Sequence, residues 1–208
     1  MKFMPKMVWD LYNFLPLNKR IFLWGRWALC PFDIIEKNVS LSGKIIDAGC
    51  GYGMLSNYIS LKSTKRKVYG FDLNKERIGV AKKTELSYRN ASFELKDVRK
   101  VNLGEIDCVV MSDFLHHLEF KSQEEFIDLC FSRLRKGGSL ILQEAIKGIS
   151  IRYALALLWD RLANYPDKIY YRRTKEWMFL LESKGFKVTI IRPRFELMPD
   201  LIFKCIKK

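Results

Sequence analysis

The chain has 208 residues, of which 49% are apolar, and it carries a net charge of +14 and five cysteines. This length suits one domain, and this apolar content is enough to build a core. The odd number of cysteines, with no C-x-x-C pair, argues against a disulfide framework or a zinc site and predicts a reducing compartment. Residues 1–6 lack the apolar core of a signal peptide, and no apolar run approaches membrane-spanning length. We therefore expect a soluble, cytoplasmic protein without a bound metal ion.

The positive charge is concentrated in the last part of the chain. Residues 1–40 carry six basic and three acidic side chains, residues 41–146 seventeen and fourteen, and residues 147–208 fourteen and six. The last segment alone thus has a net charge of +8. A basic surface attracts nucleic acid, an anionic membrane or an acidic carrier, and a Lys-rich sequence can also be basic for no functional reason.

Residues 1–40 are rich in aromatic side chains and are predicted to form a helical cap ahead of the first strand. A helix is expected over 19–29, with Ile21, Trp24 and Ala28 on one face. Pro31 permits a second helix over 32–37. Either this cap only packs on the sheet, or its aromatic side chains also line a substrate pocket or touch a membrane surface, and both can hold.

From residue 44 onwards, strand and helix patterns alternate. Strands are predicted at 44–48, 67–72, 91–96, 107–111 and 139–143, and helices at 54–61, 74–87 and 122–134. The last helix is expected to open at a capping box, Ser122-x-x-Glu125, with its end marked by Gly137 and Gly138. Such alternation predicts an α/β fold with a parallel sheet and helices on both faces.

The alternation breaks after Glu144. A helix is predicted over 149–163, too short to span a bilayer, and residues 165–175 then interleave aromatic with basic side chains. Thr174 is expected to cap a helix that ends at Gly185. The final strands are predicted at 187–192 and 201–206, as an antiparallel pair.

The most informative stretch runs from Ile45 to Gly53. It is typical of a short buried strand that ends in a glycine-rich turn, with a helix beginning near Met54. The glycines let the bare backbone approach a ligand, and the helix would point its first amides at that ligand. A dinucleotide fingerprint requires Gly or Ala where Met54 stands, and the Gly-Lys-Ser/Thr of a P-loop is absent.

The pattern Asp-x-Gly-Cys-Gly-x-Gly at 47–53, followed by Asp72 at the end of the next strand, closely resembles the first motif of the class I S-adenosylmethionine-dependent methyltransferases. The resemblance covers about residues 40–208 in strand order. It implies a Rossmann-like fold with a mostly parallel seven-stranded sheet and helices on both faces. Together with the N-terminal helical cap and the chain length, we expect one domain over 1–208, with a cap at 1–40, a cofactor-binding core at 41–146 and substrate-side helices and final strands at 147–208.

The same resemblance implies S-adenosylmethionine as cofactor and assigns residues to it. Asp47 and the backbone of the glycine turn would hold its amino acid part, Asp72 with its neighbour Leu73 the ribose, Asp97 with Val98 the adenine, and Ser112 would lie under the methionine part. The residues assigned in the glycine turn are Gly49, Cys50, Gly51 and Gly53. Alternatively, Asp72 caps the helix starting near Asn74, and Asp97 only stabilises a turn.

His116 and His117 are the only histidines and form a Leu-His-His segment similar to one found after the fourth strand in many small-molecule methyltransferases. We predict that one of them acts as a catalytic base, since imidazole titrates near neutrality. Adjacent helical residues point about 100° apart, so at most one should face the site. The alternative is that one packs and the other is a cap or is solvated.

Other pocket candidates follow the fifth strand. Glu144 and Arg152 qualify by location only, and five residues of the aromatic and basic run could bind an anionic or aromatic acceptor. These five are Tyr165, Tyr170, Tyr171, Arg172 and Arg173. Such a run can also stack on nucleic acid, or form a partly packed and partly solvated loop.

These features predict a methyltransferase acting on a small-molecule acceptor, lipid-like or carrier-bound, by direct in-line displacement, with peripheral contact to an anionic membrane. The alternative is an RNA methyltransferase that uses the basic C-terminal region. Against it, the fourth strand ends in Ser-Asp-Phe-Leu rather than an Asn/Asp-Pro-Pro-Tyr motif, and no Pro-Cys pair suggests a cytosine-C5 enzyme. A non-enzymatic binder is disfavoured by the intact cofactor motifs.

Overall fold

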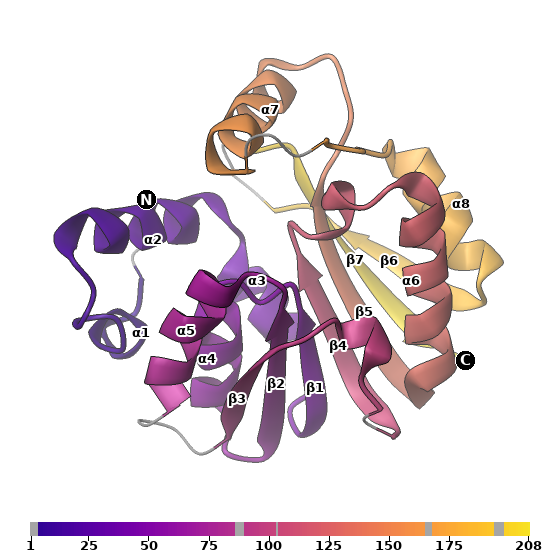
Figure 1. The fold of residues 1–208 in the computed structure, drawn as a ribbon. Helices are drawn as coiled ribbons and strands as arrows, with labels where there is room; N and C mark the ends of the chain where they lie inside the picture. The colour runs from indigo at the N-terminus through magenta and orange to yellow at the C-terminus, as the bar shows by residue number, and fades with distance from the viewer. Residues whose placement is uncertain (1–3, 86–89, 103, 165–167, 194–197) are drawn as a thin grey trace. The chain divides into compact units, whose positions relative to one another are not determined.

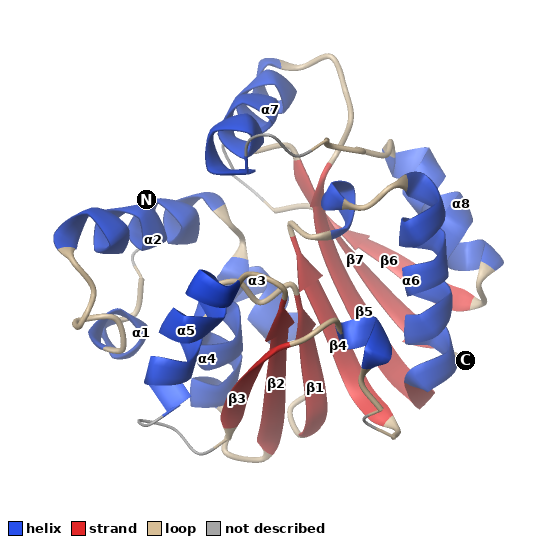
Figure 2. Cartoon of the chain, in the orientation of Figure 1, coloured by secondary structure: helices blue, strands red, loops and turns tan. Residues whose placement is uncertain are grey.

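The computed structural model describes residues 4–85, 90–102, 104–164, 168–193 and 198–208, with the backbone alone for 159–164. Its parts form two compact units, Met1–Val101 and Asn102–Lys208. The ribbon of each unit can be followed in Figure 1, and its helices and strands in Figure 2. The units are described one at a time.

The first unit contains three parallel strands in the order β3-β2-β1. They are β1 (Gly43–Ala48), β2 (Arg66–Asp72) and β3 (Ala91–Leu95), joined by α4 (Met54–Lys62) and α5 (Lys75–Thr84). Ile45, Ile46, Phe71 and Phe93 are all buried, as branched and aromatic residues are in a sheet covered by helices. The predicted strand–helix alternation is confirmed in this unit; the predicted end of the second helix, at residue 87, lies outside the described residues.

The N-terminal segment is helical, as predicted. It forms α1 (Lys6–Asp10), α2 (Leu17–Leu29) and α3 (Phe32–Asn38). The apolar face expected from Ile21, Trp24 and Ala28 is not the buried one: Leu23 and Trp27 are buried, whereas Ile21 is 57% exposed. Trp27 packs edge-on against Tyr58 of α4 with ring centroids 5.0 Å apart, which buries more apolar surface than Ile21 could.

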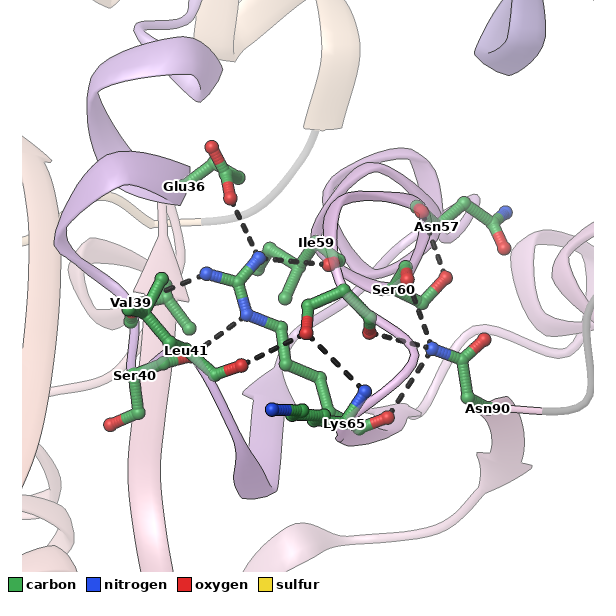
Figure 3. A network of polar contacts seen from close by, with 11 residues as sticks. Glu36, Val39, Ser40, Leu41, Asn57, Ile59, Ser60, Lys65 and Asn90 are labelled. Atoms are coloured by element: carbon green, nitrogen blue, oxygen red, sulfur yellow. Dashed lines mark hydrogen bonds and ion pairs between the residues drawn. The ribbon is translucent and has the colours of Figure 1, made fainter.

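A buried ion pair connects α3 to the start of β2 (Figure 3). Arg66 is 1% exposed and donates through Nη1 to Glu36 Oε1 at 2.6 Å. Its other N–H groups donate to the carbonyl oxygens of Ser40 (2.8 Å), Ile59 (3.0 Å) and Val39 (3.3 Å). Because the guanidinium is hydrogen-bonded through all three of its nitrogens, the helical cap is fastened to the sheet at this point.

The second unit contains four strands in the order β4-β5-β7-β6. β4 (Ile106–Ser112) and β5 (Leu134–Ala145) are parallel, while β7 (Asp200–Lys207) is antiparallel to both β5 and β6 (Phe186–Ile191). The predicted antiparallel final pair is therefore confirmed. The helices of this unit are α6 (Phe120–Arg133), α7 (Ile151–Asn164) and α8 (Thr174–Ser183).

The predicted capping box of α6 is wrong. The helix begins at Phe120, so Ser122 lies inside its first turn and Glu119 stands at the N-cap without a side-chain bond. The Gln123 N–H donates to the Glu119 carbonyl at 2.9 Å, which extends the helix to this earlier start. Polar spacing alone does not distinguish a cap from a first turn.

Gly137 and Gly138 do not end the helix directly; they lie in a bulge of β5. Ile106 pairs with Leu134 and Cys108 pairs with Ser139, so four residues of β5 intervene. Gly137 has a φ of 75°, and a Cβ on Gly138 would lie 2.8 Å from the Arg135 carbonyl oxygen.

The start of α8 is also shifted. Arg173 occupies the N-cap, its N–H donating to Glu176 at 2.7 Å, and Thr174 is the first helical residue rather than the cap. The predicted end is confirmed, since α8 stops at Ser183 and Gly185 adopts a φ of 95°.

Candidate active site

The glycine turn follows β1 in the first unit. Gly49, Gly51 and Gly53 all have left-handed dihedrals, with φ of 75°, 55° and 78°. The N–H groups of Gly49 and Cys50 donate to the Phe71 carbonyl of β2 at 2.8 and 3.1 Å. The turn is therefore held against the neighbouring strand, and α4 begins immediately after it.

The glycines of this turn serve different needs. A Cβ on Gly53 would lie 2.7 Å from the Phe93 ring, so Gly53 allows the turn to pack on β3. A Cβ on Gly51 would meet nothing within 4 Å. The backbone at Gly51 thus borders open space. The contact of this turn with the cofactor stays a prediction.

Asp47 lies beneath this turn. It is 2% exposed, and its Oδ2 accepts the Ser56 hydroxyl at 2.5 Å. Burial raises the pKa of Asp47 to about 6; the Ser56 hydrogen bond opposes this, the charge of Asp72 adds to it, and the charge of Arg26 opposes it. The Ser56 hydrogen bond ties Asp47 to helix α4, which begins directly after the turn. The contact of Asp47 with the cofactor stays a prediction.

Asp72 faces the turn from the end of β2. Its Oδ2 accepts the Gly51 N–H and its Oδ1 the Asn74 N–H, both at 2.8 Å. Helix α5 has Asn74 at its N-cap, where the Asn74 side chain accepts the Arg77 N–H at 3.0 Å. Asp72 is therefore not the N-cap residue itself, although it supports this helix start through the Asn74 N–H, as its alternative role predicted. Each carboxylate oxygen has a second lone pair, which leaves Asp72 able to accept ribose hydroxyls. Leu73 beside it is 69% exposed.

Asp97 stabilises a turn, which was the alternative to its predicted contact with adenine. Its side chain accepts the Arg99 N–H at 3.0 Å at the start of a short 3-10 helix, Val98–Lys100. Its Oδ2 also pairs with Arg99 Nη2 at 2.7 Å, and this hydrogen bond lowers the pKa of Asp97. The adenine contact of Asp97 and Val98 stays a prediction.

In the second unit, polar side chains gather at the carboxyl end of β4. The Ser112 hydroxyl donates to Gln143 Oε1 at 2.5 Å, and Gln143 Nε2 donates to Asp113 Oδ1 at 2.9 Å. The backbone of Asp113 has a φ of 50°, a left-handed conformation that residues other than glycine adopt rarely. Held strain of this kind is common at functional sites. Ser112 is 6% exposed, and its hydrogen bond to Gln143 fixes the orientation of its hydroxyl.

A buried His–Glu pair lies close by in sequence. His116 Nδ1 is 2.6 Å from Glu144 Oε2, and both side chains are 1% exposed. Glu144 Oε1 also accepts the N–H groups of Phe114 and Leu115 at 3.1 and 2.7 Å. Location alone suggested Glu144; the structure adds that it orients one of the two predicted catalytic histidines.

The neighbouring rings extend from this pair. The His117 ring is half-buried with its centroid 4.2 Å from that of His116, and Tyr171 stacks on His116 at 4.9 Å. Tyr153 of α7 meets Tyr171 edge-on at 5.6 Å. Tyr171 thus packs against one of the two candidate catalytic histidines, and α7 packs against Tyr171 through Tyr153.

The remaining pocket candidates from the sequence differ in where they lie. Arg172 donates to Gln123 Oε1 at 2.7 Å and to Glu124 at 2.9 Å, so it fastens its segment to α6. Arg152 is exposed on α7, and Tyr165 lies outside the described residues. Within the described part of the chain, no group of three His, Cys, Asp or Glu side chains could hold a metal ion.

Comparison with known proteins shows which family the chain belongs to. A family model described as "Methyltransferase domain" matches residues 27–190. The ubiquinone biosynthesis O-methyltransferase of Dechloromonas aromatica (strain RCB) is 32% identical over 117 residues, covering 53% of this chain and 48% of that protein. The protein of the same name from Colwellia psychrerythraea is 31% identical over 160 residues, covering 72% of this chain and 63% of that protein. The chain thus spans less than two thirds of the length of these relatives.

Among solved structures, magnesium protoporphyrin IX methyltransferase from Synechocystis PCC 6803 with bound S-adenosylhomocysteine is similar, with a TM-score of 0.66 at 21% identity. The match covers 97% of this chain and 93% of that one. This likeness confirms the predicted fold class.

Proposed function

Because the chain belongs to the methyltransferase-domain family of class I S-adenosylmethionine-dependent methyltransferases, we propose that it transfers a methyl group to an oxygen atom of a small-molecule acceptor. The predicted family and cofactor are confirmed by the match to this family. The choice of oxygen is supported by the relatives named as O-methyltransferases. These relatives give no support to the RNA alternative.

The donor would be held by the first unit. Gly51 offers open space beside its backbone, Asp72 offers carboxylate lone pairs, and Asp47 supplies negative charge. Bound S-adenosylmethionine supplies a methyl group activated by the positive sulfonium. The protein therefore needs mainly to align the acceptor oxygen with the methyl carbon and to receive the acceptor's proton.

The observation that carries the proposal is the His116–Glu144 pair. With a carboxylate at Nδ1, the imidazole holds its proton on that nitrogen, and Nε2 becomes the basic atom. Nε2 of His116 would receive the proton that the acceptor oxygen gives up on taking the methyl group from the sulfonium. Glu144 then stabilises the imidazolium.

Turnover of Glu144→Gln tests this role. The variant keeps an oxygen for the Phe114 and Leu115 N–H groups but removes the charge that orients and stabilises His116. We expect kcat to fall by roughly 10²-fold, at the lower end of what a general base contributes, with unchanged affinity for S-adenosylmethionine. Glu182→Gln, the same change at an exposed position of α8, is the matched control. An unchanged kcat in Glu144→Gln would exclude the pair as the base.

The acceptor is identified by a screen with labelled S-adenosylmethionine against small phenols, a lipid extract and RNA. We expect label in phenols or lipids. Label in RNA alone, with binding that weakens steeply as salt rises, would overturn the small-molecule proposal.

We further propose that the acceptor is apolar and is met at an anionic membrane surface through α7. No helix in the described ranges is long and apolar enough to cross a membrane, so contact would be peripheral. On α7, Ile151, Leu155 and Leu158 follow i, i+4, i+7 spacing and are 80%, 45% and 56% exposed. This spacing places them on one outward stripe of the helix, typical of an interfacial helix.

The surroundings of the stripe support this partner. Lys147 before α7, Arg152 on α7 and Lys168 after it are all exposed, which suits anionic lipid. The opposite side of α7 packs inward, with Tyr153 and Ala156 near Tyr171. Helix α7 would therefore join a lipid surface to the ring that stacks on His116.

A further inference from the structure

Residues 4–29, the N-terminal arm, are attached to the glycine turn through one buried side chain. Tyr12 is 1% exposed, and its hydroxyl donates to the Tyr52 carbonyl at 2.9 Å. The same hydroxyl accepts a hydrogen bond from Asn57 Nδ2 at 3.1 Å, and that amide also donates to Thr84 at 2.9 Å. A buried network thus runs from the arm, through α4, to α5.

The hydrogen bond from the Tyr12 hydroxyl to the Tyr52 carbonyl matters because of the position of Tyr52 in the turn. It lies between Gly51 and Gly53, both left-handed, so little in its neighbours' own preferences fixes the peptide that joins it to Gly53. Asp72 at the end of β2 accepts the Gly51 N–H, and the Cys50 carbonyl within the motif accepts the Gly53 N–H. Tyr12 holds the carbonyl of the intervening residue from outside the motif.

Other contacts of the arm converge on the same turn. The Phe22 ring of α2 meets the Tyr52 ring edge-on at 6.1 Å. The charge of Arg26 lowers the pKa of Asp47 against the effect of burial. Lys19 forms an ion pair with Glu76 of α5, in the helix that follows Asp72. The arm therefore contacts the turn and the helix that follows Asp72, and its positive charge acts on Asp47.

We propose that Tyr12 is a positioning residue for the donor, and that docking of the arm and binding of S-adenosylmethionine are coupled. The proposal rests on the donor site of the proposed function. When the arm is docked, Tyr12 holds the turn in the conformation that receives the donor. By linkage, the bound donor must then stabilise the docked arm to the same extent.

Calorimetric titration of Tyr12→Phe with S-adenosylmethionine tests the coupling. The variant keeps the ring and loses the hydroxyl, so we expect the Kd to rise by roughly three- to tenfold, the effect of one hydrogen bond. Ser60→Ala is the matched control, because it removes a buried hydroxyl of α4 that donates to the Asn57 carbonyl at 2.8 Å, away from the turn. It should lower the melting temperature without changing the Kd.

Hydrogen exchange of the unmodified protein provides a test that needs no variant. We expect S-adenosylmethionine to slow amide exchange in residues 8–29 as well as in β1 and β2. In Tyr12→Phe the slowing should persist in the strands and be lost in the arm. Binding with no slowing in the arm, or an equal Kd for Tyr12→Phe and the unmodified protein, would overturn the coupling alone. No binding at all would instead remove the donor site.

Discussion

At the scale of single residues, Gly51 and Gly53 separate ligand binding from packing. Gly51→Ala adds a methyl group to open space at a φ of 55°, so we expect a folded protein that binds S-adenosylmethionine at least roughly tenfold more weakly. Gly53→Ala adds a methyl group 2.7 Å from Phe93 at a φ of 78°, so we expect a loss of stability of several kcal/mol. Thermal melts with calorimetry distinguish the two. Normal donor affinity in Gly51→Ala would show that the open space is not used.

Asp47 makes stability depend on pH. Its pKa is about 6 in the folded state against 3.8 ordinarily, so the folded protein binds more protons than the unfolded chain between these values. Its contribution is therefore full below pH 4, falls as the pH rises to 6 and is constant above, a loss of roughly 3 kcal/mol.

Asp47→Asn removes this titration. In urea unfolding across pH 4–7, we expect the variant to lack that part of the slope and to be more stable at pH 7 than the unmodified protein. Its affinity for the positively charged donor should fall. Identical slopes in the two proteins would mean that burial does not raise the Asp47 pKa in the folded state.

At the scale of elements, substitutions on α7 test membrane contact separately from folding. Replacing Ile151, Leu155 and Leu158 together by Ser removes the outward stripe and leaves the inner side intact. Because each large apolar side chain contributes about 1.5–3 kcal/mol when fully buried, we expect binding to anionic vesicles to weaken by at least roughly tenfold. Co-sedimentation measures the loss.

Phe179→Ser provides the control for that experiment. Phe179 is 77% exposed on α8, away from the stripe, and its loss should leave vesicle binding unchanged. If the unmodified protein fails to sediment with anionic vesicles even at low salt, the membrane proposal falls, and methyl transfer to a soluble acceptor stands.

The elements that the sequence predicts correctly are those with local signals. The strand at Ile45 and the glycine turn lie within one short stretch whose residue types alone constrain the backbone, and Asp72 ends the next strand, which has its own apolar pattern. Boundaries such as the start of α6 depend on which of several adjacent polar residues ends outside the helix. The His116–Glu144 contact spans 28 positions and the Tyr12–Tyr52 contact 40. Such pairs are set by tertiary packing, which a single sequence does not reveal.

At the scale of the whole molecule, the proposed roles divide along the chain. Apart from Ser112, the residues assigned to the donor lie between Asp47 and Val98, in the first unit. The proposed base and the aromatic residues near it lie in the second. Substitutions in the first unit should therefore change mainly donor affinity, and those in the second mainly turnover.

Glu36→Gln tests whether stability can be changed separately from both roles. The substitution leaves the buried Arg66 guanidinium without its carboxylate, and breaking a buried pair in this way typically costs about 3–5 kcal/mol. We expect urea unfolding to show a loss of this size. Because a ligand that binds only the folded state stabilises it by about 2.7 kcal/mol at a hundredfold excess over its Kd, S-adenosylmethionine should restore much of the lost stability.

The folded Glu36→Gln variant should then turn over at the normal rate, since Glu36 contacts none of the proposed site residues through the Arg66 network. A reduced kcat at saturating donor would instead mean that the network around Arg66 also positions the site.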